Sequence, residues 1–123
     1  MIQKGEIYLV NLGTDKKGSE QMGVRPAVII QNDQGNKKST TTIVALLTSK
    51  KKTTKDGREY PMQVSVKRTD LSEGSLENDS IILCEQIYTI DQATRILKKL
   101  GRISDPAILK KLDDAVKVSL GIA

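Results

Sequence analysis

The chain contains no histidine, no tryptophan and no phenylalanine, and it has a single cysteine. Without histidine, any acid–base chemistry must proceed without imidazole, the usual proton carrier near neutral pH. A structural zinc site is excluded because the chain has neither histidine ligands nor a cysteine cluster. The only aromatic rings belong to Tyr8, Tyr60 and Tyr88. Stacking on a nucleobase would therefore depend on tyrosine or arginine.

The single cysteine and the short apolar runs place further limits on the chain. Cys84 cannot form an internal disulfide, and its position in the apolar run 81–84 favours a small buried side chain over a nucleophile. The longest apolar runs, 81–84 and 43–47, are too short to cross a bilayer. No basic segment followed by a long apolar stretch opens the chain. These features predict a cytoplasmic protein that does not enter a membrane.

The length and the charge suggest one domain with an anionic partner. A chain of 123 residues is expected to form one domain over residues 1–123. The net charge of +5 and a pI of about 9.4 favour anionic partners, nucleic acid above all. The densest basic segment lies between residues 50 and 58. It either contacts phosphates or forms a solvated loop.

The hydrophobic pattern predicts a mostly β protein with one helix. Strands are expected at residues 6–12, 26–30, 40–47, 62–66 and 80–84, with 88–90 as a further candidate, and the intervening 13–23, 32–38 and 48–59 are expected to be loops or turns. Helical spacing then begins after Asp105, a candidate N-cap followed by Pro106, and ends at Gly121. The pattern indicates a small barrel or curled antiparallel sheet with an amphipathic helix packed on it.

Three strand ends carry polar residues that are suited to nucleic acid. Arg25 precedes a proline, which favours an extended backbone and fixes the angle of its guanidinium, a group that binds phosphate in a bidentate way. The alternative is an ordinary surface arginine. The hydroxyls of Thr48 and Ser49 either hold a phosphate oxygen or cap a turn. Glu85 and Gln86 either read a base edge or mark the exit of a strand.

Taken together, these stretches resemble the MazF/PemK family of toxins. The pattern GSEQ-x-G-x-RP with its following strand and Asn-Asp step covers residues 18–33, and related motifs follow at 47–49, 79–87 and 100–103, with a fitting start at 4–8. Each motif alone is weak, but four in order along nearly the whole chain are specific. The resemblance implies an SH3-like barrel with a C-terminal helix. It also implies a homodimeric, sequence-specific and metal-independent endoribonuclease that needs no cofactor.

The resemblance further implies partners and residue roles. The substrate would be single-stranded mRNA, and a cognate MazE-like antitoxin would cover the RNA groove with an acidic, disordered tail. Arg25 and Thr48 would form the catalytic pair, which promotes attack of a ribose 2′-OH on the adjacent phosphate. The residues expected to bind substrate are Ser19, Glu20 and Gln21 at the cut site, Ser49, Lys50, Lys51 and Lys52 beside the pair, and Asn32, Asn36, Glu85 and Gln86 at the bases.

Two other functions are compatible with the same sequence pattern. A toxin of the same barrel type can inhibit a DNA topoisomerase through protein contact, without any nuclease activity. A structural RNA-binding module is the second alternative. Since a topoisomerase inhibitor does not need Arg25 and Thr48, the presence of both residues favours the nuclease.

Overall fold

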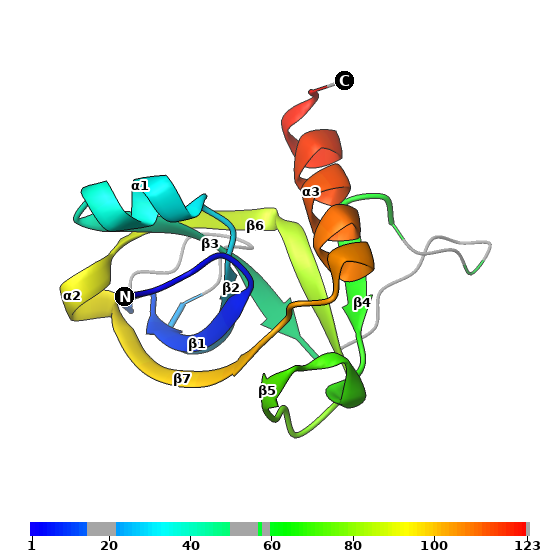
Figure 1. Ribbon diagram of the computed structural model, residues 1–123, viewed down its shortest axis with the longest axis horizontal. Coiled ribbons are helices and arrows are strands. Elements are labelled where there is room, and N and C mark those ends of the chain that lie inside the picture. The colour runs from blue at the N-terminus through cyan, green and yellow to red at the C-terminus, as the bar shows by residue number, and fades with distance from the viewer. Residues whose placement is uncertain (15–21, 50–56, 58–59, 123) are drawn as a thin grey trace.

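The computed structural model describes residues 1–14, 22–49, 57 and 60–122. It contains seven strands and three helices (Figure 1). In chain order these are β1 (Glu6–Asn11), β2 (Val24–Ile29), α1 (Asp33–Lys38), β3 (Thr41–Thr48), β4 (Gln63–Val66), a 3-10 turn (Arg68–Asp70), β5 (Glu73–Gly74), β6 (Ser80–Asp91), α2 (Gln92–Arg95), β7 (Ile96–Arg102) and α3 (Pro106–Leu120).

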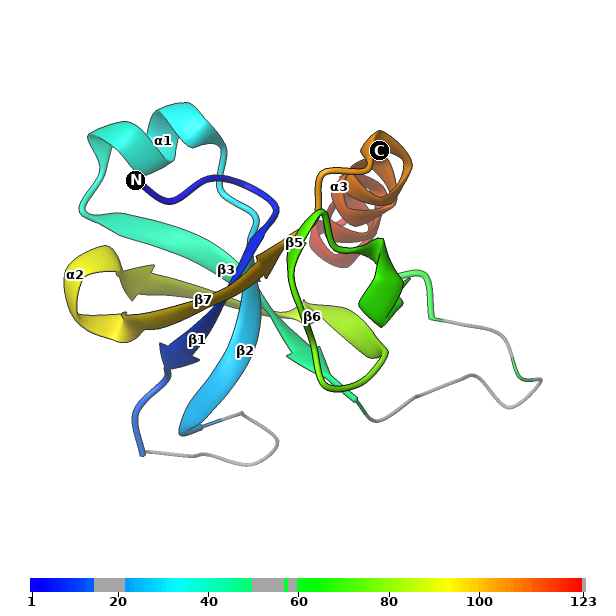
Figure 2. The ribbon, with the colours of Figure 1, turned by 60° about the horizontal axis from the view of Figure 1, so that its bottom comes forward.

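The seven strands form one curved antiparallel sheet. Their order is β4-β6-β3-β2-β1-β7-β5, and β7, β1, β2, β3 and β6 curl into a barrel-like arrangement (Figures 1 and 2). The expected strands 80–84 and 88–90 are two parts of β6. A register shift opposite Ala45 and Leu46 interrupts the pairing between them. The shift bends β6, as β-bulges do, and lets it follow the curve of the sheet. The predicted mostly β fold with a C-terminal helix is confirmed.

The central strands β2 and β3 are buried on both faces. Successive side chains of a strand point to opposite sides, so these strands contribute to two separate cores. Val28 and Ala45 belong to one cluster, while Ala27 and Val44 belong to the other. The two-sided burial explains why residues 26–30 and 40–47 read as nearly continuous apolar runs without clean alternation.

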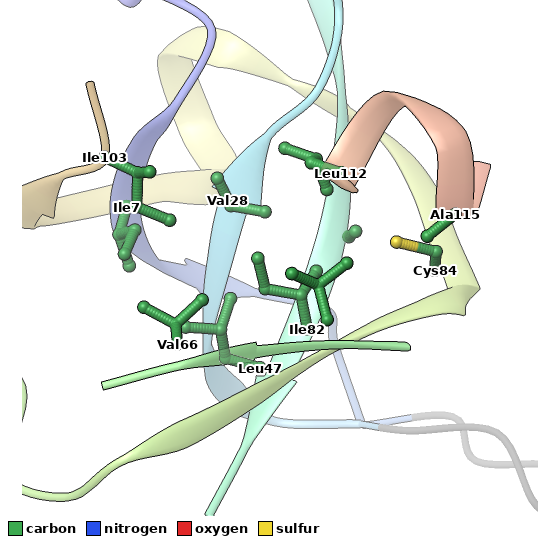
Figure 3. Close-up of a cluster of buried hydrophobic side chains, with 11 residues drawn as sticks. Ile7, Val28, Leu47, Val66, Ile82, Cys84, Ile103, Leu112 and Ala115 are labelled. Atoms are coloured by element: carbon green, nitrogen blue, oxygen red, sulfur yellow. The ribbon is translucent and has the colours of Figure 1, made fainter. Parts of the chain in front are cut away.

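The C-terminal helix α3 begins and ends where the sequence predicts. The Asp105 carboxylate accepts a hydrogen bond from the backbone N–H of Ala107, and Gly121 adopts the left-handed conformation with φ of 71°. Leu112 and Ala115 are the buried residues of α3, and Figure 3 shows them beside the first core, with Ala115 next to Cys84. No helix among the described residues is long and apolar enough to cross a membrane.

The segment 32–38 is a helix, α1, and the predicted turn is wrong. Asn32 caps this helix by accepting a hydrogen bond from the backbone N–H of Gly35 at 2.7 Å. Asn36 is only 2% exposed. Its Oδ1 accepts from Gln31 Nε2 at 3.0 Å and from Thr42 Oγ1 at 2.6 Å, and its Nδ2 donates to the Gln31 carbonyl. Buried polar contacts across the fold therefore stabilise α1, which local propensity does not reveal.

Replacing Asn36 tests this structural role. Asn36→Ala removes the acceptor of the buried Thr42 hydroxyl and two hydrogen bonds to Gln31, whose Nε2 keeps the Thr41 carbonyl, so the free energy of unfolding should fall by about 1–3 kcal/mol. Urea denaturation followed by circular dichroism measures the change. Gln34→Ala, at an exposed position of the same helix, is the matched control and should stay within about 0.5 kcal/mol of wild type. Equal stability of the two variants would contradict the structural role.

Candidate functional site

Arg25 and Thr48 lie near neighbouring ends of two paired strands. Strand β2 pairs with β3 from Ile29 opposite Val44 to Ala27 opposite Leu46, and Arg25 and Thr48 each lie two residues beyond that last pair. Both residues line a pocket of about 590 Å³, and both also line an adjoining recess of about 30 Å³. The structure therefore brings the two predicted catalytic residues together.

The pocket is lined by apolar and polar residues, and its lining has a net positive charge. Its described charged residues are Arg25, Lys98 and Glu77, which gives two cations against one carboxylate. Its remaining lining residues are the apolar Leu9, Pro26, Leu47, Leu76 and Leu100 and the polar Thr48, Ser49, Ser75, Asn78 and Ser80. Such a surface offers an apolar bed for a ribose or base and several donors for phosphate oxygens.

Backbone hydrogen bonds join the chain just before Arg25 to the end of β1. Gly23 has a φ of 79°, a conformation that glycine adopts without strain, and its N–H donates to the carbonyl of Gly13 at 2.6 Å. Its own carbonyl accepts from the N–H of Leu12 at 2.9 Å. The Nε of Arg25 donates to the carbonyl of Met22 at 3.1 Å, which orients the guanidinium. The rigid ends of β1 and β2 thus position the arginine at the pocket.

One wall of the pocket, formed by residues 75–78, is attached to β7 by close backbone contact. Gly74 has a φ of 70°, and a Cβ added there would meet the Leu100 carbonyl oxygen at 2.0 Å. A Cβ on Gly101 would meet the Glu73 carbonyl oxygen at 2.7 Å. The N–H of Ser75 then donates to the carbonyl of Leu100 at 3.1 Å. Two glycines therefore allow β5 and β7 to lie close together. This contact places residues 75–78 at the pocket.

The predicted substrate-binding residues divide into three groups. Ser49 lines the pocket beside Thr48. Ser19, Glu20, Gln21, Lys50, Lys51 and Lys52 lie outside the described residues. The remaining four, Asn32, Asn36, Glu85 and Gln86, are absent from the pocket lining.

Those four residues have partners within the fold. Asn32 caps α1, and Asn36 is buried with its hydrogen bonds satisfied, so the predicted base contact of Asn36 is not supported by its position. The Glu85 carboxylate accepts from Gln63 Nε2 at 3.0 Å. The side-chain oxygen of Gln86 accepts from the Tyr88 hydroxyl at 3.1 Å. Glu85 remains exposed and Gln86 partly so.

Cys84 and Glu6 have shifted pKa values but lie outside the pocket lining. Burial, with a smaller contribution from the charge of Glu85, raises the pKa of the Cys84 thiol to about 12, which keeps it protonated at neutral pH. Burial alone would also raise the pKa of Glu6. Hydrogen bonds from Lys99, the Gln3 backbone and Tyr8 outweigh it and hold that pKa below its ordinary value. These groups have structural rather than chemical roles.

Sequence reasoning missed Lys98 and the wall residues Ser75 and Asn78. Lys98 stands next to Lys99 in a strand that the hydrophobic pattern does not reveal, and nothing local separates the two lysines. The wall residues come from a turn-rich stretch. Their place at the pocket depends on the contact between β5 and β7, two segments about 25 residues apart in the chain.

Comparisons with known proteins identify the family of this chain. The family described as PemK-like, MazF-like toxin of type II toxin–antitoxin system matches residues 3–120. A protein from Staphylococcus saprophyticus, Endoribonuclease MazF, is 42% identical over 122 residues, which cover 99% of this chain and 93% of the relative.

Solved structures show the same fold at lower sequence identity. A mycobacterial endoribonuclease in complex with its cognate antitoxin has a TM-score of 0.76 at 20% identity and covers 100% of this chain and 98% of its own. MazF from Deinococcus radiodurans has a TM-score of 0.73 at 21% identity, with 98% and 97% covered. The family resemblance read from the motifs is confirmed. Because the family match and a 42% identical relative both extend along nearly the whole chain, this protein belongs to the PemK-like, MazF-like toxins of type II toxin–antitoxin systems.

Proposed function

We propose that this toxin is an endoribonuclease that cleaves single-stranded RNA, such as mRNA, at specific sequences and without a metal ion. The observation that carries the proposal is that Arg25 and Thr48 line one pocket, whose described charged residues are two cations and one carboxylate. The Staphylococcus saprophyticus relative named Endoribonuclease MazF supports the same activity. In a bacterial cell the substrate would be met in the cytoplasm, where mRNA is translated.

In the proposed reaction, a ribose 2′-oxygen attacks its own adjacent phosphorus. A new bond forms between the 2′-oxygen and phosphorus, the bond from phosphorus to the 5′-oxygen breaks, and a proton leaves the 2′-hydroxyl while another reaches the 5′-oxygen. The first products are a 2′,3′-cyclic phosphate and a 5′-hydroxyl. Negative charge accumulates on the two non-bridging oxygens in the transition state, so the catalytic requirement is a donor fixed near those oxygens.

Arg25 is suited to that requirement. A guanidinium presents planar donors that match two oxygens of one phosphate. The hydrogen bond from the Arg25 Nε to the Met22 carbonyl orients it before substrate binds. Thr48, which lines the same pocket, supplies a hydroxyl that holds a phosphate oxygen or the attacking 2′-hydroxyl. A charge fixed in advance does not need to reorganise as the reaction proceeds.

The pair distinguishes this function from inhibition of a topoisomerase. A toxin that acts through protein contact needs an exposed recognition surface and no convergent phosphate-binding groups. Here an arginine and a threonine converge on one pocket whose walls add the hydroxyls of Ser49 and Ser75. That arrangement favours phosphate chemistry.

Substitution of Arg25 and Thr48 tests the mechanism. Arg25→Ala should lower kcat by about 10²–10³-fold, and Thr48→Val should lower it less, because each removes a donor that strengthens in the transition state. Gel assays of a single-stranded RNA measure the rates. Arg25→Lys should recover little activity, since lysine lacks the planar fork. Thr48→Ser keeps the hydroxyl and should recover most of it. Arg95→Ala, which removes an arginine outside the pocket lining, is the matched control.

Two further observations decide whether the chemistry is as proposed. A 2′-deoxy substitution at the cleaved nucleotide should abolish cutting because the nucleophile is gone. Cleavage should persist in excess chelator, because Arg25 supplies the charge that a metal would otherwise provide. Activity that disappears with EDTA and returns with magnesium would refute the metal-independent mechanism. Melting curves of the variants close to wild type would show that the loss is chemical, since Arg25 is exposed.

An acidic antitoxin is the natural inhibitor of such a pocket. The chain has a net charge of +5, and the pocket contributes Arg25 and Lys98 to that excess. A disordered segment rich in Asp and Glu would be attracted to the same charges as RNA and would fold as it binds. The mycobacterial structure solved with its cognate antitoxin supports this part of the proposal.

The last part of the proposal is a homodimer. Three large apolar side chains near the end of α3, Val118, Leu120 and Ile122, are 51%, 60% and 56% exposed. Exposed apolar side chains of this size favour cover by another protein surface. Strand β4 is also the outermost strand at one edge of the sheet, and open edges favour further pairing.

Sedimentation of the purified toxin tests the dimer. Wild type at micromolar concentration should sediment at about 27 kDa, twice the 13.5 kDa of one chain. Leu120→Lys places a charge among the exposed apolar side chains near the end of α3 and should shift the population towards monomer. Lys117→Gln, at an exposed polar position of the same helix, should leave the mass unchanged. A wild-type monomer that still cuts RNA would contradict the dimer without affecting the catalytic assignment.

A further inference from the structure

Lys98 is a cation of the pocket that the fold itself does not use. It is exposed, it lines the pocket together with Arg25 and Thr48, and no hydrogen bond or ion pair joins it to any part of the chain that the structure describes. An unpaired lysine at the edge of a pocket is compatible with a solvated surface residue. Three features of β7 indicate a more specific role for Lys98.

The first feature is the pair of irregularities that surround Lys98. Strand β7 pairs with β1 so that Leu9 faces Lys98, and register shifts follow on both sides, between Leu9 and Val10 and between Ile7 and Tyr8. Bulges redirect side chains and occur preferentially near functional sites. Here the two shifts leave Lys98 on the pocket, together with Leu100.

The second feature is the contrast with the neighbouring lysine. Lys99 forms ion pairs with Glu6 at 2.7 Å and with Glu73 at 3.2 Å, so its charge is matched within the fold. These contacts connect β7 to β1 and to β5. Because β7 is held by Lys99, the backbone of Lys98 is fixed, and its ammonium is left for a ligand.

The third feature is the alignment of Lys98 with the catalytic strands. Leu9 faces Pro26 on one side and Lys98 on the other, so the three residues form one row across β2, β1 and β7. Neighbouring strands lie about 4.8 Å apart, which separates the Pro26 and Lys98 backbones by about 10 Å. Arg25 precedes Pro26, so the two pocket cations begin about two strand spacings apart. An RNA strand crosses such a row with more than one phosphate.

We infer that Lys98, with Ser75 and Asn78 on the adjoining wall, binds a second phosphate of the RNA, one that is not cleaved. The inference rests on the proposed function and adds a positioning contact to it. An ammonium is a point charge with three donors, well suited to a phosphate that needs no fixed bidentate geometry. The hydroxyl of Ser75 and the amide of Asn78 line the same pocket and supply neutral donors. Lys98 would add affinity for the RNA strand, while Arg25 holds the phosphate that is cleaved.

A contact with a non-reacting phosphate has a specific kinetic signature. It contributes equally to the ground state and the transition state, so its loss raises KM and leaves kcat unchanged. It also releases a counterion on binding, and each phosphate contact to a single strand adds about 0.7 to the slope of log K against log salt. Sequence preference should not change, because phosphates carry no base information.

The test compares wild type with Lys98→Gln, Lys98→Arg and the control Lys38→Gln, which removes one charge from α1 away from the pocket lining. The probe is an RNA oligonucleotide that contains a site cut by wild type, with a 2′-deoxy version for binding by fluorescence anisotropy. Lys98→Gln should raise KM by about 3- to 10-fold and lower the salt slope by about 0.7, with kcat within about twofold of wild type. Lys98→Arg should restore both values, and Lys38→Gln should match wild type.

Each other outcome overturns the inference. An unchanged KM and salt slope in Lys98→Gln would leave the lysine as a solvated residue. A lower kcat at constant KM would place it on the reacting phosphate instead. Weaker binding of an acidic antitoxin peptide, with RNA binding unaffected, would assign the lysine to the protein partner. If wild type cuts no RNA at all, the proposed function is wrong. This result differs from failure of the Lys98 inference alone, in which wild type cuts RNA and Lys98→Gln behaves like wild type.

Discussion

The pairing of β2 with β3 fixes the position of the functional residues. The register is determined by burial on both faces of these strands, because Val28 and Ala45 enter one core while Ala27 and Leu46 enter the other. A slip by one residue would exchange the two sets and place differently sized side chains in both cores. Arg25 and Thr48 each lie two residues beyond the last pair of this register. The packing of apolar side chains in the interior thus determines the geometry of the candidate catalytic pair at the surface.

The other side of the pocket depends on a separate constraint. Its wall exists because Gly74 and Gly101 permit backbone contact between β5 and β7, and because Lys99 connects these strands to the buried Glu6. These contacts lie at the β5 end of the sheet, four strands away from β3. The curvature of the sheet brings residues of β3 and of the segment after β5 to one pocket, so the site depends on the barrel-like arrangement (Figure 2).

Some elements were predictable from sequence because local signals determine them. The helix α3 has a capping Asp105, a proline at its first position and Gly121 at its end, and the bounds of β1, β2, β3 and β4 were predicted within two residues, whereas β6 was predicted as two separate pieces. The helix α1 was missed because Asn36 is held by Thr42 in β3, a contact that local propensity does not reveal. Strand β7 was missed because two register shifts remove the alternation that marks a strand.

The residues of the candidate site likewise divide into those that sequence motifs predicted and those that only the folded structure reveals. Arg25 and Thr48 were identified from their places in motifs, and the pairing of β2 with β3 explains why those motifs occur together. Lys98 and the wall residues 75–78 carry no local signal, since only the contact between β5 and β7 assigns them to the pocket. Asn36 was predicted to contact a base because an asparagine amide can read base edges. Residue type does not show whether a side chain is exposed, and Asn36 is buried in the interior.

The absence of histidine shapes the electrostatics of the site. The pocket cations are an arginine and a lysine, and no imidazole is present to share their role. The nearby groups with shifted pKa values do not alter this: the pKa of Glu6 is lowered, and burial together with the charge of Glu6 raises the pKa of Tyr8 to about 12. Both shifts move titration further from neutrality. The described pocket therefore offers cations held by paired strands in place of an imidazole, and such cations act by stabilising negative charge on a phosphate.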